Sequence, residues 1–204
     1  MKRSDRTPST LASVGGELMD GFGRVHRDLR ISVTDRCNFR CRYCMPAEGL
    51  EWLPRDGLLS FEEISRVASL VVERFGIRSI RLTGGEPTVR AKLPDLVRLL
   101  SPLPVDLALT TNGATLRLLA DELAEAGLDR INVSLDSLRR DRFEELTMRD
   151  GLERVLDGLL DRLAVGGSVF IGDVRSLPLL EAFHLSVQLH KSDETTPVEQ
   201  LRGR

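Results

Sequence analysis

Four short segments that alternate apolar and polar residues constrain the fold of this chain more than any other feature. They lie at residues 28–34, 78–83, 105–111 and 130–135. Each has the length and pattern of a β-strand. Because helical patterns separate them, the repeated β-α units predict a parallel sheet with right-handed crossovers.

The helical patterns lie at residues 60–75, 91–100 and 116–126, with one or two more segments within 139–163. Ser60 and Glu63 have the spacing of a capping box at the start of the first helix. Gly76 and Gly127 stand where two of the helices should end. The chain therefore reads as an α/β protein whose helix boundaries are well marked.

The alternation within the strands indicates more than their existence. Strands of a parallel sheet are usually buried on both faces and apolar throughout. Here Ile80 and Leu82 alternate with Arg81 and Thr83, and the other three strands behave alike. We expect the apolar face to meet the helices and the polar face to line a wet concavity. This is the geometry of a partial (β/α) barrel of four to five units. The alternative is a doubly wound sheet that tolerates polar residues. The side chains expected in the concavity are Arg30, Ser32, Arg81, Thr83, Thr110, Asn112, Ser134 and Asp136.

The composition indicates one ordinary globular domain. The chain has 204 residues, 41% of them hydrophobic and 29% charged, with a formal net charge of −2. The near-neutral charge argues against nucleic-acid binding, and no apolar run approaches the roughly 20 residues of a membrane helix. Without an apolar signal segment at the N-terminus, we expect a cytoplasmic protein and no membrane contact. Arginines gather between Arg24 and Arg42, either as a solvated basic surface or as an attraction for a small anion.

All three cysteines lie within one eight-residue stretch, as Cys37, Cys41 and Cys44. An odd number at this spacing is poor for disulfides and favours a metal in a reducing compartment. A closed zinc site needs a fourth ligand, for which His26 is the nearest candidate. An iron–sulfur cluster on three cysteines instead leaves one iron open to a small molecule. A purely structural cysteine cluster is the remaining alternative. We expect the flanking arginines to help keep the thiols ionised.

The spacing Cys-x3-Cys-x2-Cys, with Tyr43 before the last cysteine, resembles the signature of radical S-adenosylmethionine enzymes. Four blocks in order extend the match: LRISVTDRCNFRCRYCMP, IRLTGGEP, TTNG and GLDRINVSLDSL. Together they resemble the molybdenum-cofactor GTP 3′,8-cyclase family over about residues 21–160. The resemblance implies a lyase that reductively cleaves S-adenosylmethionine to a deoxyadenosyl radical. That radical abstracts hydrogen from GTP, in the first step of molybdenum cofactor biosynthesis. An electron donor is implied as a partner; a homo-oligomer and contact with the next enzyme of the pathway stay open.

The resemblance also assigns the cofactor-binding residues. Cys37, Cys41 and Cys44 would hold one [4Fe–4S] cluster, whose open iron would bind S-adenosylmethionine. The cofactor itself would contact Tyr43, Gly85, Glu86 and Ser134. For Tyr43 the alternative is simple packing, and for the Gly-Gly-Glu-Pro segment it is a plain turn after the strand.

The implied GTP-binding residues are Arg30, Arg81 and Thr110. An inward arginine on a strand is costly to bury without an anionic partner, and a triphosphate would supply one. The alternative for each arginine is an internal salt bridge, with Asp106 or Asp136 as candidates. No catalytic side chain is implied.

These expectations divide the chain into three parts. Residues 1–22 are expected to form a flexible leader and residues 23–163 the radical S-adenosylmethionine core. Residues 164–204 form a divergent tail in place of the family's remaining barrel units and its second three-cysteine cluster. We therefore expect a complete cofactor half and an incomplete GTP half. The rival hypotheses are the same cofactor acting on another substrate, and a protein that only binds a metal or a partner.

Overall fold

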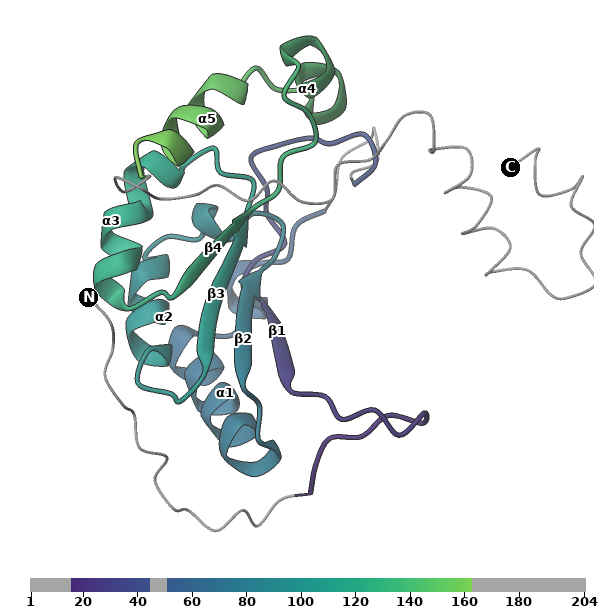
Figure 1. The fold of residues 1–204 in the computed structure, drawn as a ribbon, viewed down its shortest axis with the longest axis vertical. Coiled ribbons are helices and arrows are strands. Elements are labelled where there is room, and N and C mark those ends of the chain that lie inside the picture. The colour runs from purple at the N-terminus through teal and green to yellow at the C-terminus, as the bar shows by residue number, and fades with distance from the viewer. Residues whose placement is uncertain (1–15, 45–50, 163–204) are drawn as a thin grey trace, which may run out of the picture. The chain divides into compact units, whose positions relative to one another are not determined.

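The computed structural model describes residues 16–44 and 51–162 (Figure 1). The predicted tail at 164–204 lies outside the described residues, as does the first part of the predicted leader. The described part of the leader contains one antiparallel bridge, between Met19 and Val25. None of the described helices is long and apolar enough to cross a membrane.

The centre of the fold is a four-stranded parallel sheet. Its strands are β1 Asp28–Ser32, β2 Ser79–Thr83, β3 Asp106–Thr111 and β4 Arg130–Val133. They pair in the order β1-β2-β3-β4 without reversal. A doubly wound sheet reverses its strand order at a switch point, whereas a (β/α) barrel adds each strand beside the previous one. The described strands therefore confirm the partial-barrel prediction over the doubly wound alternative.

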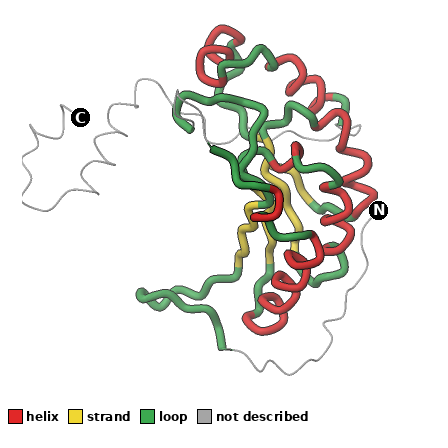
Figure 2. The backbone as a smooth tube through the Cα atoms, turned by 180° about the vertical axis from the view of Figure 1, so that it is seen from behind, coloured by secondary structure: helices red, strands yellow, loops and turns green. Residues whose placement is uncertain are grey.

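The helices follow the strands as predicted, with α1 at Phe61–Phe75, α2 at Leu93–Leu100 and α3 at Leu116–Ala126. The last predicted region contains two helices, α4 Arg140–Thr147 and α5 Leu152–Leu160. Two short 3-10 turns at Arg55–Gly57 and Pro87–Val89 were not predicted. Helices α1, α2 and α3 lie on one side of the sheet, as both backbone views show (Figures 1 and 2).

The first helix begins and ends where its capping residues predict. The Ser60 hydroxyl accepts a hydrogen bond from the Glu63 backbone N–H at 3.1 Å, and the Glu63 carboxylate accepts one from the Ser60 N–H at 2.8 Å. These two bonds are the capping box. Gly76 then ends the helix in the left-handed region, with φ 65°, where glycine lacks the steric penalty of a side chain.

The apolar face of the sheet forms the core, as predicted. Ile80 and Leu82 of β2 and Leu107 and Leu109 of β3 are at most 1% exposed. They pack in one cluster with buried residues of α1, α2 and α3. A second, smaller cluster surrounds Phe143 and includes the buried residues Phe39, Leu152 and Val155. Among the polar-face residues, Arg30, Ser32, Arg81, Ser134 and Asp136 are exposed. That this face lines a wet concavity beside the cysteine loop stays a prediction.

Candidate functional site

The cysteine loop follows β1 directly and is anchored at its start and around Cys41. Beyond the strand, the Val33 N–H still donates to the Thr83 carbonyl at 2.9 Å. Further along, the backbone N–H groups of Arg40 and Arg42 donate to carbonyls of Thr147 and Leu146 at the end of α4, both at 3.0 Å. The end of helix α4 therefore holds the segment that carries the cysteines through two backbone hydrogen bonds. No sequence pattern predicted this contact.

An aromatic pair reinforces the contact between α4 and the cysteine loop. The rings of Phe39 and Phe143 meet edge to face, with their centroids 5.7 Å apart. Both side chains are at most 5% exposed, and Cys37 and Cys41 pack against their cluster. Phe39 lies two residues from each of these cysteines, so its burial holds that stretch of backbone against α4.

The three thiols differ in their surroundings. Cys37 and Cys41 are half-buried, Cys44 is exposed, and all three are free. Burial raises the pKa of the Cys37 thiol and also the pKa of the Cys41 thiol. Arg40 lowers the pKa of Cys37 only as a smaller, opposing influence. The expectation that flanking arginines keep these thiols ionised is therefore wrong for Cys37 in the chain alone, because desolvation outweighs the charge of Arg40. For Cys41 burial is again the main cause of the raised pKa.

The Gly-Gly-Glu-Pro segment after β2 packs against the root of the cysteine loop. The Gly85 N–H donates to the Thr34 carbonyl and the Glu86 N–H to the Arg36 carbonyl, both at 2.7 Å. A Cβ atom on Gly84 or Gly85 would lie 2.4 Å from the carbonyl oxygen of Thr34 or Arg36, respectively. Glycine is thus required here because two segments of the chain's own backbone touch. The plain-turn interpretation misses this contact.

Glu86 carries a buried carboxylate that accepts four hydrogen bonds. One oxygen accepts from the Thr88 N–H at 3.1 Å, the Thr88 hydroxyl at 2.5 Å and the Thr111 hydroxyl at 2.6 Å. The other accepts from the Asn112 N–H at 2.6 Å. The side chain is 1% exposed, so these donors replace the water it loses. The expected contact of this carboxylate with S-adenosylmethionine stays a prediction; in this geometry the carboxylate joins the ends of β2 and β3, and Gly85 is the exposed part of the segment.

Two side chains at the carboxyl ends of strands reach the cysteine loop. Asn112, after β3, donates from Nδ2 to Oδ1 of Asn38 at 2.7 Å. Asp136, after β4, accepts from the Tyr43 hydroxyl at 2.9 and 2.8 Å with its two oxygens. Asn112 and Asp136 were expected on the polar face, Asp136 also as a candidate partner for an arginine, but neither was expected to bind the cysteine loop. Their position could have indicated a functional role, because functional groups of (β/α) folds gather at the carboxyl ends of the strands.

The remaining predicted cofactor residue, Ser134, forms no side-chain hydrogen bond to the others within the described residues. Ser134 follows β4 and is exposed, and its N–H donates to the Thr111 carbonyl at 2.8 Å. Tyr43 leaves 66% of its surface exposed although its hydroxyl is bound. The structure thus joins Tyr43 to Asp136 beside Cys41, and in the described residues Ser134 is bound to this group by no side-chain hydrogen bond.

The predicted GTP-binding residues lie side by side on the open face. Arg30 and Arg81 are direct register partners across β1 and β2, and both are exposed. Within the described part of the chain neither forms an ion pair. Of the two carboxylates considered as partners, Asp106 instead binds Arg130 at 3.1 Å, and Asp136 binds Tyr43. Two like charges directly opposite each other are unfavourable, which makes this row receptive to an anion.

Thr110 lies two residues beyond Ala108, the register partner of Arg81, toward the carboxyl end of β3. Its hydroxyl oxygen is buried and has no hydrogen-bond partner among the described residues. A buried hydroxyl without a partner is costly. It is therefore a group that a bound ligand could satisfy.

The thiols fit an iron–sulfur cluster better than a single metal ion. Across residues 16–44 and 51–162, no three His, Cys, Asp or Glu side chains converge on one ion. The zinc alternative required His26, whose Nε2 instead lies 3.5 Å from an oxygen of Asp20. The thiolates of a [4Fe–4S] cluster bind different irons, so they need not converge on one point. Three free thiols on one loop are the donor set that such a cluster takes.

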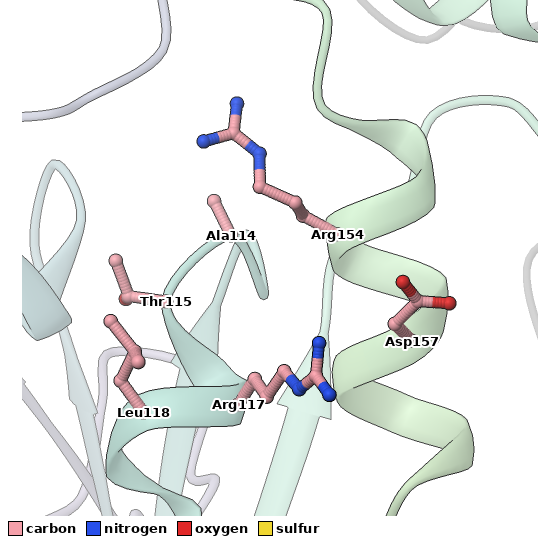
Figure 3. A pocket seen from close by; sticks show the side chains of 6 residues that line it. All are labelled: Ala114, Thr115, Arg117, Leu118, Arg154 and Asp157. Carbon is pink, nitrogen blue, oxygen red and sulfur yellow. The ribbon is translucent and has the colours of Figure 1, made fainter.

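A separate pocket lies on the helix side, between the start of α3 and α5 (Figure 3). Its volume is about 270 Å³, and no predicted site residue lines it. The residues that line it are Ala114, Thr115, Arg117, Leu118, Arg154 and Asp157. Arg117 points along this wall and pairs with Asp161 at 3.1 Å, so its charge is already balanced.

Comparison with known proteins agrees with this geometry. The profile of the Radical SAM superfamily matches residues 31–172. That is more than half of the chain, so the chain belongs to this superfamily. Membership implies a [4Fe–4S] cluster and S-adenosylmethionine as the cofactors. In the solved structure of Streptococcus suis SuiB bound to precursor peptide SuiA, 29% of the chain aligns with 65% of this one at a TM-score of 0.52. Because the sequence identity is 20%, that match shows a shared fold alone.

The particular relatives are GTP 3′,8-cyclases, which confirms the resemblance stated above. The enzyme of that name from Rhodopirellula baltica is 54% identical over 144 residues, covering 70% of this chain and 40% of the relative. GTP 3′,8-cyclase 2 of Mycobacterium tuberculosis is 51% identical over 154 residues, 74% and 42% of the two chains. Molybdenum cofactor biosynthesis protein 1 of Drosophila melanogaster is 54% identical over 144 residues, 70% and 25%. The chain thus spans about two fifths or less of the length of these relatives.

Proposed function

We propose that this chain carries the S-adenosylmethionine-cleaving part of a GTP 3′,8-cyclase, the lyase that begins molybdenum cofactor biosynthesis. One observation carries the proposal. A loop with three free thiols meets the carboxyl ends of the strands, beside a face with two arginines that form no ion pair within the described residues. The identity of 51–54% to enzymes of that name supports it. Because the chain covers less than half of those relatives, the whole activity is a proposal for this chain.

In this proposal Cys37, Cys41 and Cys44 hold the cluster. When bound, the cluster would supply the electron for reductive cleavage of S-adenosylmethionine, the source of the radical chemistry proposed for GTP. The chain's own residues orient and shield the reactants. Tyr43 is suited to a planar base because its hydroxyl is tied to Asp136 while most of the ring is exposed.

The rest of the proposed S-adenosylmethionine site comes from two strand ends. The exposed backbone of Gly85 offers a carbonyl and an approach without a side chain. Ser134 offers a hydroxyl on the exposed end of β4. The buried carboxylate of Glu86 holds this segment against β3, so its contribution to cofactor binding includes orientation of the loop.

Arg30, Arg81 and Thr110 are proposed to bind GTP. A triphosphate would neutralise the two facing guanidinium groups and could approach bidentate geometry with either. The unsatisfied Thr110 hydroxyl lies in the next row. An electron donor is part of the same proposal, and so is a cytoplasmic location, since the thiols must stay reduced.

For the 204-residue chain itself we propose cofactor cleavage poorly coupled to GTP. The proposed cofactor residues all lie before residue 140, inside the segment shared with the relatives. The match extends over only 40–42% of the bacterial enzymes. The family resemblance also implies a GTP-contacting lysine and a second three-cysteine cluster, which the family carries outside the matched segment. Losing two charged contacts at about 1.5 kcal/mol each lowers affinity more than a hundredfold.

The test is anaerobic reconstitution of the chain with iron and sulfide, followed by addition of dithionite and S-adenosylmethionine. We expect one [4Fe–4S] cluster per chain, slow release of deoxyadenosine, and little cyclised product when GTP is added. Each Cys→Ser variant at 37, 41 or 44 should abolish cluster uptake. Binding of one zinc without acid-labile sulfide, or a cluster that never yields deoxyadenosine, contradicts the proposal and favours a protein that only binds metal. Efficient cyclisation of GTP would show that the cleavage is coupled after all.

The GTP site is tested separately by titration of the chain with GTP. Arg81→Ala should weaken binding by roughly tenfold or more, since hydrogen bonds to charged groups contribute about 1.5–3 kcal/mol. Arg66→Ala, an exposed arginine on α1, removes the same charge from the opposite side and is the matched control. Equal weakening by both variants would mean that GTP responds only to the overall charge.

A further inference from the structure

The orientation of the Asn112 side chain can be assigned because each of its polar groups has a partner. Its backbone N–H donates to Glu86 at 2.6 Å. Its Oδ1 accepts from the Ala114 N–H at 3.0 Å, which forms a local turn of the kind that asparagine favours. With Oδ1 occupied in this way, the Nδ2 amide must point to the other side.

That other side is the cysteine loop. The amide donates to Oδ1 of Asn38 at 2.7 Å and lies 3.9 Å from the sulfur of Cys37. The same sulfur accepts a hydrogen bond from the Phe39 N–H at 3.4 Å. Cys37 is therefore approached by two N–H donors, one from its own loop and one from the end of β3.

Donors at this place act on a cluster in two ways. Hydrogen bonds to the sulfur ligands and the local charge set the reduction potential of an iron–sulfur cluster. Groups that orient metal ligands also set how tightly the metal is held, and changing one typically costs 10- to 100-fold in affinity. Asn112 directly follows β3, whose end Glu86 ties to the end of β2, so its donor is held by the sheet and not by the cysteine loop.

We propose that Asn112 is a positioning residue for the cluster, which holds the cysteine loop through Asn38 and tunes the cluster through Cys37. The inference rests on the proposed function, because it requires that Cys37 binds the cluster. It adds a link from β3 to the loop that neither the family match nor the relatives assign.

The test compares two substitutions of nearly equal shape in the reconstituted 204-residue chain. Asn112→Asp keeps the oxygen that accepts from Ala114 but replaces the donor with a negative oxygen facing Cys37. Asn132→Asp adds the same charge on β4, in register with Thr110, and has no hydrogen bond to the cysteine loop in the described residues. Cluster reduction potential is measured by redox titration with electron paramagnetic resonance detection. Cluster retention is measured as the rate of bleaching by an iron chelator.

We expect Asn112→Asp to release the cluster roughly 10- to 100-fold faster than the wild-type chain. The reduction potential of its cluster should become more negative, by about 59 mV for each tenfold decrease in the equilibrium constant for one-electron reduction. Asn132→Asp should release the cluster at the wild-type rate. Asn112→Ser keeps a short oxygen that can accept from Ala114 and adds no charge, so its rate of cluster release should lie between those of the two Asp variants. If Asn112→Asp does not fold, Asn112→Ser replaces it in the test.

The outcomes separate the inference from the proposed function. If the wild-type chain takes up no cluster, both are overturned. If it takes up a cluster and Asn112→Asp matches it in release rate and potential, only the inference is overturned. If Asn112→Asp folds with a wild-type circular dichroism spectrum and takes up no cluster while Asn132→Asp does, the positioning role is supported.

Discussion

The two faces of the sheet share one backbone but differ in solvent exposure. On one face, Ile80 and Leu82 are fully buried under the helices. On the other, one residue away along the same strand, Arg81 is exposed beside Arg30. Substitutions on the buried face should be costly, because packed interiors respond to the loss of even a methylene group. The exposed face contributes little to the core, so its side chains are available for ligands.

The ends of the strands combine both properties. Glu86 and Thr111 are polar and yet at most 2% exposed, because they satisfy each other across β2 and β3. These residues stabilise the fold and also support the loop that carries the cysteines. The effect of a substitution on the free energy of unfolding should therefore depend on whether it lies on the buried face, at a strand end or on the exposed face.

Leu82→Ala should have the largest effect on stability. Leu82 is 0% exposed, and truncation of a fully buried leucine lowers the free energy of unfolding by about 2–5 kcal/mol. Urea denaturation of the reduced chain without metal measures the change. Leu118→Ala, at a position that is 81% exposed on α3, should change it by no more than about 0.5 kcal/mol. A similar loss for both variants would mean that the helix-covered face is not the core.

Gly85→Ala should come next, at about 3 kcal/mol, the upper end for forcing atoms into filled space. The new Cβ would lie 2.4 and 2.5 Å from the carbonyl oxygens of Arg36 and Asp35, and neither backbone segment can move cheaply. Gly21→Ala is the control, since nothing lies within 4 Å of its Cβ position. The same urea titration applies, and a neutral Gly85→Ala would refute the close approach of the two segments.

Glu86→Gln should lower the free energy of unfolding by about 2 kcal/mol. The carboxylate accepts from donors at both oxygens, whereas an amide has one oxygen and would turn an N–H group toward one of these donors. Glu62→Gln, exposed in the first turn of α1, is the control for the lost charge. If both variants were equally stable, the Glu86 carboxylate would not be the buried acceptor described above.

Arg81→Ala should have the smallest effect, within about 0.5 kcal/mol and toward higher stability. The substitution relieves the like-charge pair with Arg30, and like charges directly opposite each other destabilise a sheet. Added salt should narrow the difference from the wild-type chain, because exposed charges are screened. A loss as large as that of Glu86→Gln would reveal a structural partner for Arg81.

Much of the fold could be predicted because its determinants are local. The period of two in β2 and the capping pair Ser60–Glu63 depend on residues close together in the chain, and both have the structure they predict. The cluster motif is local too, since its three cysteines share one loop. The contacts of Asn112 with Asn38 and of Asp136 with Tyr43 join residues 74 and 93 positions apart, and no pattern within one segment announces them.

The sequence alone therefore determined the elements, their polar and apolar faces, and the family, because these follow from side-chain period and short motifs. The tertiary structure decided which groups meet. It showed that the glycines after β2 make room for the chain's own backbone. It also showed that Glu86 is buried among hydroxyl and amide donors. Burial raises the pKa of the Cys37 thiol more than the nearby arginine lowers it. Each of these depends on desolvation and on distances between segments that only folding brings together.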